Sequence, residues 1–145
     1  MIKINKLLFS DKLNIEKCFQ IRKEVFVKEQ ECDPKDEYEN EKESIHFLIS
    51  EKNKNYATAR YRKTKKGIKM ERFAVLKEHR GKGYGHMILN AMLKDLKNIK
   101  VTKYLHAQIQ VVGFYEKKGF EKIGDKFDEV GIMHYKMIFQ EKIKN

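Results

Sequence analysis

A glycine-rich loop between a strand and a helix is the feature of this sequence that most restricts its fold. The loop, RGKGYG at residues 80–85, follows an apolar stretch at 68–76 and opens residues 84–97, which carry apolar side chains on one helical face. A helix start presents unpaired backbone N–H groups and the positive end of the helix dipole. Glycines let that backbone approach a pyrophosphate without interference from side chains. These residues therefore predict a strand, a phosphate-binding loop and a helix in succession.

The loop differs from two other phosphate-binding loops. It lacks the Gly-Lys-Ser/Thr ending of nucleoside triphosphatases, and it has no third glycine at the spacing of a dinucleotide-binding turn with an acidic partner downstream. A nucleoside triphosphate is therefore not the expected ligand. An R-x-x-G-x-G string is weak evidence when it stands alone, and its alternative interpretation is an ordinary glycine turn.

The rest of the sequence alternates between strand and helix patterns. Apolar runs, turn residues and helical spacing predict strands at 2–8, 45–50, 56–62, 68–76, 102–108 and near 120–126 and 132–139, with helices after Asp11 or Asn14, at 84–97 and at 111–118. No repeat or linker marks a boundary, so we expect one domain over residues 1–145. The expected fold class is α/β (α+β): a mixed, mostly antiparallel twisted sheet of six to seven strands with helices on both faces.

Composition excludes two classes of protein. The hydrophobic fraction is 41% and the charged fraction 37%, which excludes a membrane protein and a disordered chain of low hydrophobicity. The N-terminal residues have no secretory signal pattern, so we expect a cytoplasmic protein. In that reducing compartment Cys18 and Cys32 are expected to be free thiols rather than a disulfide.

Charge is unevenly distributed along the chain. The formal net charge is +11, but residues 29–43 hold eight of the 21 acidic residues and carry −6, which leaves +17 for the rest. One interpretation is a solvated acidic loop on a lysine-rich surface. Only residues 61–66, YRKTKK, come close to a basic stretch with an aromatic residue. A nucleic-acid-binding module is therefore an alternative function that we do not favour, and we expect no nucleic-acid partner.

Three blocks of the sequence together resemble the GNAT superfamily of N-acetyltransferases. They are MERFAV at 70–75, the loop at 80–85 and FYEKKGF at 114–120, and they occur in the order and spacing of that family. Residues 22–30 and 127–134 further resemble a bacterial subset of the family whose acceptors are poorly assigned. The resemblance implies a GNAT-like fold and a transfer of the acetyl group of acetyl-coenzyme A to an amine.

The resemblance also implies which residues bind coenzyme A. By position they are Phe73, Ala74, Val75, Arg80, Gly81, Lys82, Gly83, Tyr84, Gly85, Gln108, Phe114 and Lys118. Two positions depart from the family pattern, because Gln108 and Val111 stand where many members carry Asn and Ala. This departure concerns contacts beyond the pyrophosphate loop, so cofactor binding is still expected.

Acetyl transfer to an amine needs a neutral nitrogen, a polarised thioester carbonyl and a proton for the departing thiolate. Tyr115 is the expected acid, because a phenol titrates near 10 and a thiol near 8.5; its alternative role is core packing. The base is left open between Glu71, His134 and water-mediated deprotonation. For the carbonyl, the resemblance implies the backbone N–H of Phe73 or Ala74.

The acceptor is expected to be a small, cationic primary amine. In the family, the first helix and the loop after it border the acceptor entrance, and here that loop is the acidic segment 29–43. The residues expected to bind the acceptor are Arg22, Phe26, Glu29, Gln30 and Glu129. We expect a monomer or a homodimer.

Other chemistries have less support in the sequence. His79, His86 and His106 have neither the i, i+4 spacing nor the carboxylate of a recognised metal site, so we expect no metal. No serine lies in the sequence context of a hydrolase nucleophile. The main alternative function is a coenzyme A or acyl-coenzyme A sensor that has kept the cofactor loop but lost turnover.

Overall fold

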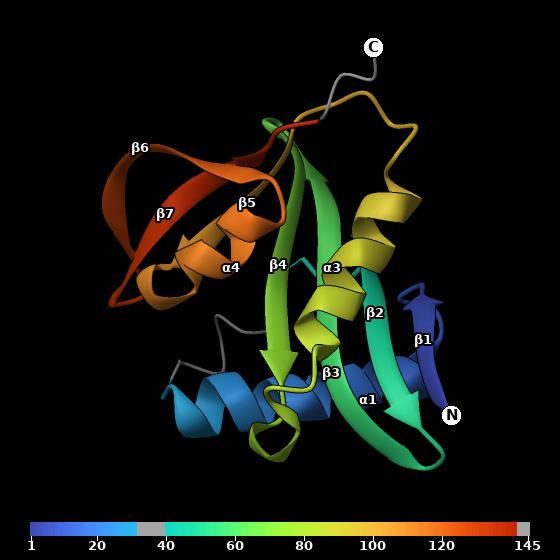
Figure 1. Cartoon of the computed structure of the whole chain (residues 1–145). Helices are drawn as coiled ribbons and strands as arrows, with labels where there is room; N and C mark the ends of the chain where they lie inside the picture. Colours follow the sequence, from blue (N-terminus) through green and yellow to red (C-terminus); the bar gives the residue numbers. More distant parts are fainter. Residues whose placement is uncertain (32–39, 142–145) are drawn as a thin grey trace. The chain divides into compact units, whose positions relative to one another are not determined.

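The computed structural model describes residues 1–31 and 40–141 of the chain (Figure 1). Its elements are, in order, β1 (Ile2–Leu7), α1 (Lys12–Arg22), the π-helix η1 (Lys23–Glu29), β2 (Ser44–Glu51), β3 (Lys54–Thr64), β4 (Gly67–Val75), the 3-10 helix η2 (Lys77–His79), α3 (Tyr84–Asp95), β5 (Lys103–Gln108), the 3-10 helix η3 (Ile109–Val111), α4 (Val112–Lys117), β6 (Phe120–Glu129) and β7 (Ile132–Phe139). Every strand and helix predicted from the sequence is present, with small shifts at the ends. Most of the acidic segment, and Cys32 with it, lies outside the described residues.

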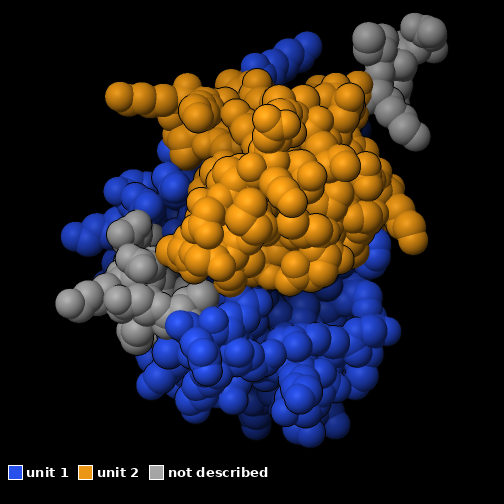
Figure 2. Space-filling model, turned by 90° about the vertical axis from the view of Figure 1, so that its left-hand side faces the viewer, with its two compact units in different colours: residues 1–63, 71–100 blue, residues 64–70, 101–145 orange. Residues whose placement is uncertain are grey.

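Seven strands form one sheet in the order β1-β2-β3-β4-β5-β7-β6. Strand β2 pairs antiparallel with β1 and β3, and β7 pairs antiparallel with β5 and β6, whereas β4 and β5 are parallel. The predicted mixed, mostly antiparallel sheet is thereby confirmed. The chain groups into two compact units, residues 1–63 with 71–100 and residues 64–70 with 101–145 (Figure 2).

In the first unit, α1 and α3 cover opposite faces of the strands (Figure 1). The Tyr61 hydroxyl of β3 donates to Asp95 of α3. The neighbouring Arg60 instead binds Glu41, which is also bound by Arg22 of α1. Because successive residues of a strand point to opposite faces, this alternation places one helix on each side. The core on the α1 side consists of Leu7, Ile15, Cys18, Ile21, Val25, Phe26, Leu48 and Ala74.

The first helix begins as predicted and then changes its geometry. Asp11 caps α1, since its side chain accepts from the backbone N–H of Asn14 at 3.5 Å. After Arg22 the helix widens into the π-helix η1, and the N–H of Gln30 reaches the carbonyl of Val25 at 3.1 Å. The sequence pattern predicted helical spacing here but not this widening, which is rare and often found near functional sites.

In the second unit, a tight turn joins β6 to β7. Val130 and Gly131 both have positive φ, 47° and 79°, and the Asp128 carboxylate accepts from the N–H of Gly131 at 3.0 Å. Two consecutive positive φ values match the right-handed twist of a hairpin, although a β-branched residue is unfavourable there. The turn fixes the register, so that Glu129 lies opposite Ile132 and Phe127 opposite His134.

Two further findings concern the expectations about a membrane protein and about free thiols. No helix within residues 1–31 and 40–141 is long and apolar enough to cross a membrane. Cys18 is a free, buried thiol on α1, and burial raises its pKa to about 11.

Candidate active site

The loop at residues 80–85 has the backbone of a ligand cradle. Gly81 and Gly83 have φ values of 79° and 83°, and a Cβ added at either would meet no atom within 4 Å. Within residues 1–31 and 40–141 no side chain packs there to exclude a larger residue, so the left-handed backbone, and not crowding, accounts for both glycines. Gly83 begins α3, and no side chain in the described part of the chain caps that helix start. The cradle therefore has room and backbone N–H groups for an anion.

Aromatic rings hold both ends of this loop. Tyr84, which directly follows Gly83 in the loop, stacks on Tyr56 of β3 with ring centroids 5.4 Å apart and an interplanar angle of 16°. His79, just before the loop, packs against the same Tyr56 at 4.0 Å. The Tyr56 carbonyl also accepts from the N–H of Leu76 at 3.0 Å. Tyr56 thus contacts residues at both ends of the loop and fixes their position. The sequence analysis missed this role, because the strand pattern around Tyr56 gave no sign of these contacts.

Arg80 is tied to two other residues of the first unit. Its Nε donates to the Val75 carbonyl at 2.9 Å, and its Nη2 donates to the Glu29 carboxylate. Val75 and Arg80 were both expected to bind the cofactor, and the structure brings them together. Glu29 was expected to bind the acceptor, but here it pairs with Arg80 of the loop at residues 80–85.

One non-glycine residue of strand β4 lies in the left-handed region. Arg72 has a φ of 59°, which costs a non-glycine residue about 1–2 kcal/mol. Its guanidinium lies over the ring of Phe26, with 5.9 Å from Cζ to the centroid. The bend rotates the backbone next to Phe73, the expected donor to the carbonyl, while the following Ala74 is buried in the core.

The Glu71 carboxylate serves as a counter-ion for two arginines of β3. Its Oε2 accepts from Arg60 Nε at 2.7 Å and from Arg62 Nε at 3.0 Å. As a base, Glu71 would take up a proton of the acceptor while its Oε2 is bound by these two arginine donors.

Arg22 lies inside the first unit rather than on a surface. It is 1% exposed and donates to both oxygens of Glu41, at 3.1 Å from Nη1 and 2.7 Å from Nη2. Phe26 is also buried, whereas Gln30, which follows the last residue of η1, is exposed. Arg22 and Phe26 were expected to bind the acceptor. In the structure both side chains are buried and contribute to packing in the first unit.

Tyr115 is buried among aromatic rings of the second unit. Phe114 and Phe120 pack edge-on against it, with centroids 4.9 and 5.8 Å away. Burial raises the pKa of the Tyr115 phenol well above its usual range. The phenol is protonated at neutral pH, as an acid has to be, and its raised pKa makes it a weaker acid toward a thiolate than an exposed tyrosine. Lys118 ends the same helix, and Gln108 ends β5, where its side-chain oxygen accepts from Gln110 at 2.6 Å.

Two histidines flank the carboxylate of Glu129 in the second unit. His106 Nδ1 lies 3.2 Å from Glu129 Oε1, and His134 Nε2 lies 3.6 Å from Glu129 Oε2. The hydrogen bond from His106 is the largest influence on the pKa of Glu129 and lowers it, against the opposing effect of burial. Lys69 Nζ, 4.0 Å from Oε1, acts in the same direction as His106. The sequence analysis named Glu129 and His134 but treated His106 only as a rejected metal ligand.

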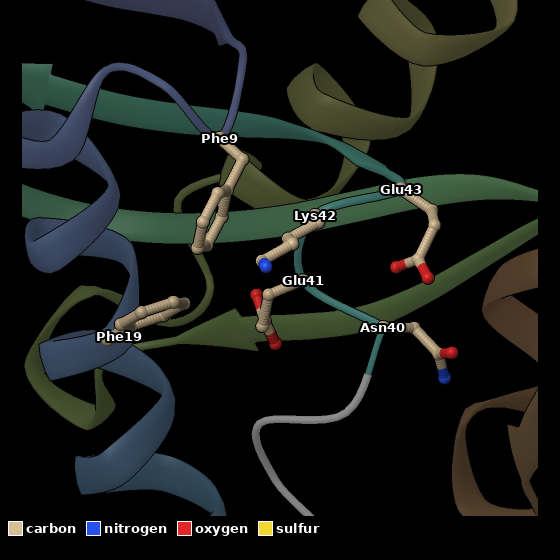
Figure 3. A pocket seen from close by; sticks show the side chains of 6 residues that line it. All are labelled: Phe9, Phe19, Asn40, Glu41, Lys42 and Glu43. Atoms are coloured by element: carbon tan, nitrogen blue, oxygen red, sulfur yellow. The ribbon is translucent and has the colours of Figure 1, made fainter.

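A separate pocket of about 440 Å³ lies in the first unit (Figure 3). Phe9 and Phe19 form one wall and residues 40–43 the other. Residues 40–43 belong to the acidic segment that was expected at the acceptor entrance, whereas Phe9 and Phe19 were not expected in the site. Glu41 turns its carboxylate to Arg22 and Arg60, so the pocket offers mainly an apolar surface. Among the residues that the structure describes, no group of three or more His, Cys, Asp or Glu side chains could hold a metal ion.

The residues present fit coenzyme A at the loop. The cradle has two glycines in left-handed conformation, open space at both Cβ positions and an uncapped helix start, as a pyrophosphate requires. Arg80 and Lys82 add positive charge beside it. When bound, the cofactor supplies an activated thioester, and the chain has to hold it, polarise its carbonyl and manage the protons.

Comparisons with known proteins agree with this geometry. Residues 11–141 match the family described as acetyltransferase (GNAT) domain. YjcF, an uncharacterized N-acetyltransferase of Bacillus subtilis, is 35% identical over 127 residues, which cover 86% of this chain and 91% of YjcF. An acyl-CoA N-acyltransferase of Pseudomonas aeruginosa has the same fold, with a TM-score of 0.86 at 21% identity, over 97% of this chain and all of the other. The PaiA N-acetyltransferase of Thermoplasma acidophilum, solved with coenzyme A, gives a TM-score of 0.68 at 16% identity, over 97% and 99% of the two chains.

Proposed function

Since the chain belongs to the GNAT acetyltransferase family and is therefore an acyl-coenzyme A-dependent N-acetyltransferase, we propose that it acetylates the primary amine of a small, cationic acceptor. The transfer is a direct attack of the amine on the acetyl thioester. The proposal includes a single domain over residues 1–145, a cytoplasmic location and a monomer or homodimer.

The loop at residues 80–85 is the observation that carries the cofactor part of the proposal. Its two left-handed glycines have free space in place of a Cβ, and the start of α3 follows directly. Backbone N–H groups at a helix start bind phosphate oxygens without any side-chain charge. In the proposal, residues 80–85 bind the pyrophosphate of coenzyme A.

The chemistry is divided among a few other residues. The backbone beside the bend at Arg72 directs the N–H of Phe73 or Ala74 to the thioester carbonyl, whose oxygen gains negative charge during attack. Tyr115, which is protonated at neutral pH, gives a proton to the departing thiolate. Gln108, Phe114 and Lys118 stay in the proposal as further cofactor contacts.

The acceptor class depends on the carboxylates that are available to a cation. Glu29 and Glu41 are paired with arginines of the chain itself, so two members of the acidic segment are already neutralised. Glu129 has Lys69 and His106 beside one of its oxygens, but its carboxylate is 38% exposed and its lowered pKa keeps it ionised. An exposed carboxylate beside aromatic rings favours an ammonium group over an anion. Glu129 is thus the main residue that supports a cationic acceptor.

Two measurements test the proposed function. Thermal unfolding is recorded with and without acetyl-coenzyme A, and at one hundred times the dissociation constant the ligand should add about 2.7 kcal/mol. Release of free thiol is then followed with 1,4-diaminobutane, spermidine, glucosamine and a short lysine-containing peptide as acceptors, and acetate or glutamate as acidic controls. Stabilisation together with turnover of a cationic amine is expected. Stabilisation without turnover of any of these amines would contradict the acceptor class.

A further inference from the structure

The environment of His134 determines which of its nitrogens carries a proton. Its Nδ1 lies 2.7 Å from the carbonyl oxygen of Ile132. A carbonyl oxygen only accepts hydrogen bonds, so Nδ1 is the protonated nitrogen of the neutral ring. The lone pair is then on Nε2, which faces Glu129 Oε2 at 3.6 Å. Two acceptors, an imidazole nitrogen and a carboxylate, therefore lie next to each other.

The rest of the cluster holds these two groups in place. His106 Nδ1 lies 3.2 Å from the other Glu129 oxygen, and since an ionised carboxylate only accepts, His106 is the donor. The Phe127 ring stacks on His134, with centroids 6.0 Å apart, and meets His106 edge-on at 5.0 Å. Three neighbouring strands, β5, β6 and β7, supply these side chains, so each is fixed by the register of the sheet.

From this arrangement, which rests on the proposed function, we propose that His134 is the general base for an ammonium acceptor and that Glu129 and His106 position it. The ammonium donates one hydrogen bond to the Glu129 carboxylate, which is the more exposed of the two acceptors. A second N–H bond breaks and its proton forms a new N–H bond at His134 Nε2. The amine nitrogen keeps the electron pair with which it attacks the acetyl carbonyl. The imidazolium that results is stabilised by Glu129 and by the Ile132 carbonyl.

The charged groups around His134 agree with this role. Glu129 from β6 is the anion next to Nε2, while Lys69 from β4 and His106 from β5 face the far oxygen of that carboxylate. The carboxylate therefore keeps one oxygen toward His134 while the other is held. Glu71, the rival base, uses its Oε2 to bind two arginines instead. This difference in hydrogen bonding distinguishes the two candidates, which the sequence alone left equal.

The test compares His134→Gln, Glu129→Gln and His106→Gln with the parent, using the most active amine of the panel named above. Glu121→Gln is the matched control, because Glu121 is exposed on the same strand as Glu129 and has no part in the cluster. At pH 7 we expect His134→Gln to lower kcat/KM about 100-fold or more, Glu129→Gln about tenfold and His106→Gln less, with affinity for coenzyme A unchanged.

The pH dependence separates a base from a structural residue. Without its base, the enzyme can use only the neutral fraction of the amine, which rises about tenfold per pH unit below the pKa of the amine. The ratio of parent to His134→Gln rates should therefore shrink from pH 7 to 9. A ratio that does not change with pH would overturn the inference, and so would a full parental rate in the variant. If His134→Gln does not fold, Glu129→Gln, at the more exposed position, gives the decisive measurement: full activity overturns the inference. A parent that turns over none of the amines would instead contradict the proposed function.

Discussion

Arg80, the first residue of the loop at residues 80–85, donates from its Nη2 to both carboxylate oxygens of Glu29, each at a distance of 2.9 Å. Glu29 is the last residue of η1, so this ion pair fastens the end of the first helix to the loop. Both side chains are partly exposed, 44% and 30%, and such pairs stabilise a fold by less than about 1 kcal/mol. The carboxylate also adds a negative charge beside a loop that is proposed to receive a pyrophosphate.

Removing that charge should strengthen cofactor binding. In Glu29→Gln, Arg80 loses a competing anion, and we expect the dissociation constant of coenzyme A to fall about two- to fivefold at low salt and less at high salt. Calorimetry at two ionic strengths measures this change. Glu24→Gln is the matched control, because Glu24 is exposed on the same π-helix and pairs with Lys28 instead. Weaker binding by Glu29→Gln would mean that Glu29 holds Arg80 in its binding position.

Gly83→Val should abolish coenzyme A binding in a protein that still folds. The substitution adds a side chain to the open space of the cradle and strains a backbone with a φ of 83°. Gly124→Val is the control, because Gly124 has nearly the same φ of 75° and equally open space but lies in β6. Both variants should lose about 1–2 kcal/mol of stability from backbone strain. Equal affinity for coenzyme A in the two variants would remove the loop from the cofactor site.

Tyr115→Phe should lower kcat about 100-fold at pH 7 with little change in the dissociation constant of coenzyme A, because only the proton for the thiolate is lost. The raised pKa of this phenol has a second consequence. Tyr115 stays protonated above its usual value of 10, so its ionisation should cause no loss of activity at pH 9. Stopped assays from pH 6 to 9 test both points, with Tyr135→Phe as the control. An unaltered rate in Tyr115→Phe would leave this tyrosine with a packing role.

Much of the fold could be predicted because local patterns determine it. The apolar face of α3, the capping Asp11 and the alternation in β3 are each visible within a few residues of sequence. The widening of the first helix after Arg22 could not be predicted in this way. The buried Arg22, directly before the widening, pairs with Glu41, which is 19 residues away in the sequence, and a local pattern does not show such a tertiary contact.

The candidate site shows the same division between local and distant information. Glycines at 81 and 83 predicted a cradle, because left-handed backbone before a helix has a recognisable residue pattern. The partners of Glu29, Glu71 and Glu129 were not predictable, since each lies on another element. Charge alone suggested that Glu29 and Glu41 face an acceptor, whereas the fold uses both as counter-ions of arginines.

His46 should make stability depend on pH below about 6.5. It is completely buried, and burial is the main reason why its pKa is lowered from 6.5. Between the folded and unfolded pKa values the unfolded chain binds a proton that the folded chain refuses, so the free energy of unfolding falls as the pH falls. This contribution is complete above pH 6.5. Urea unfolding of the parent and of His46→Gln from pH 5 to 7 should give a smaller slope for the variant. Identical slopes would show that the pKa of His46 is the same in the folded and the unfolded chain.

Glu41→Gln should be the most destabilising single substitution among these predictions. Glu41 accepts from Arg22 and, at 2.5 Å, from Nη1 of Arg60, and both arginines are 1% exposed. Glutamine keeps the shape but removes the charge that two buried guanidinium groups share, and breaking such a pair costs about 3–5 kcal/mol. Glu43→Gln, two residues further and exposed, should change stability by less than about 0.5 kcal/mol.

A second variant decides whether this cost comes from the buried charge. Replacing both partners, in Arg22→Met with Glu41→Leu, removes the ions together, and apolar groups of similar volume often substitute for a buried pair at little cost. Arg60 then still has Glu71 as its counter-ion, at 2.7 Å from its Nε. We therefore expect the double variant to be more stable than Glu41→Gln in urea unfolding. A double variant that is less stable than Glu41→Gln would mean that the geometry of this network, and not its charge balance, holds α1 to β3. The same geometry would then fix the position of Arg22, directly before the π-helix that carries Glu29.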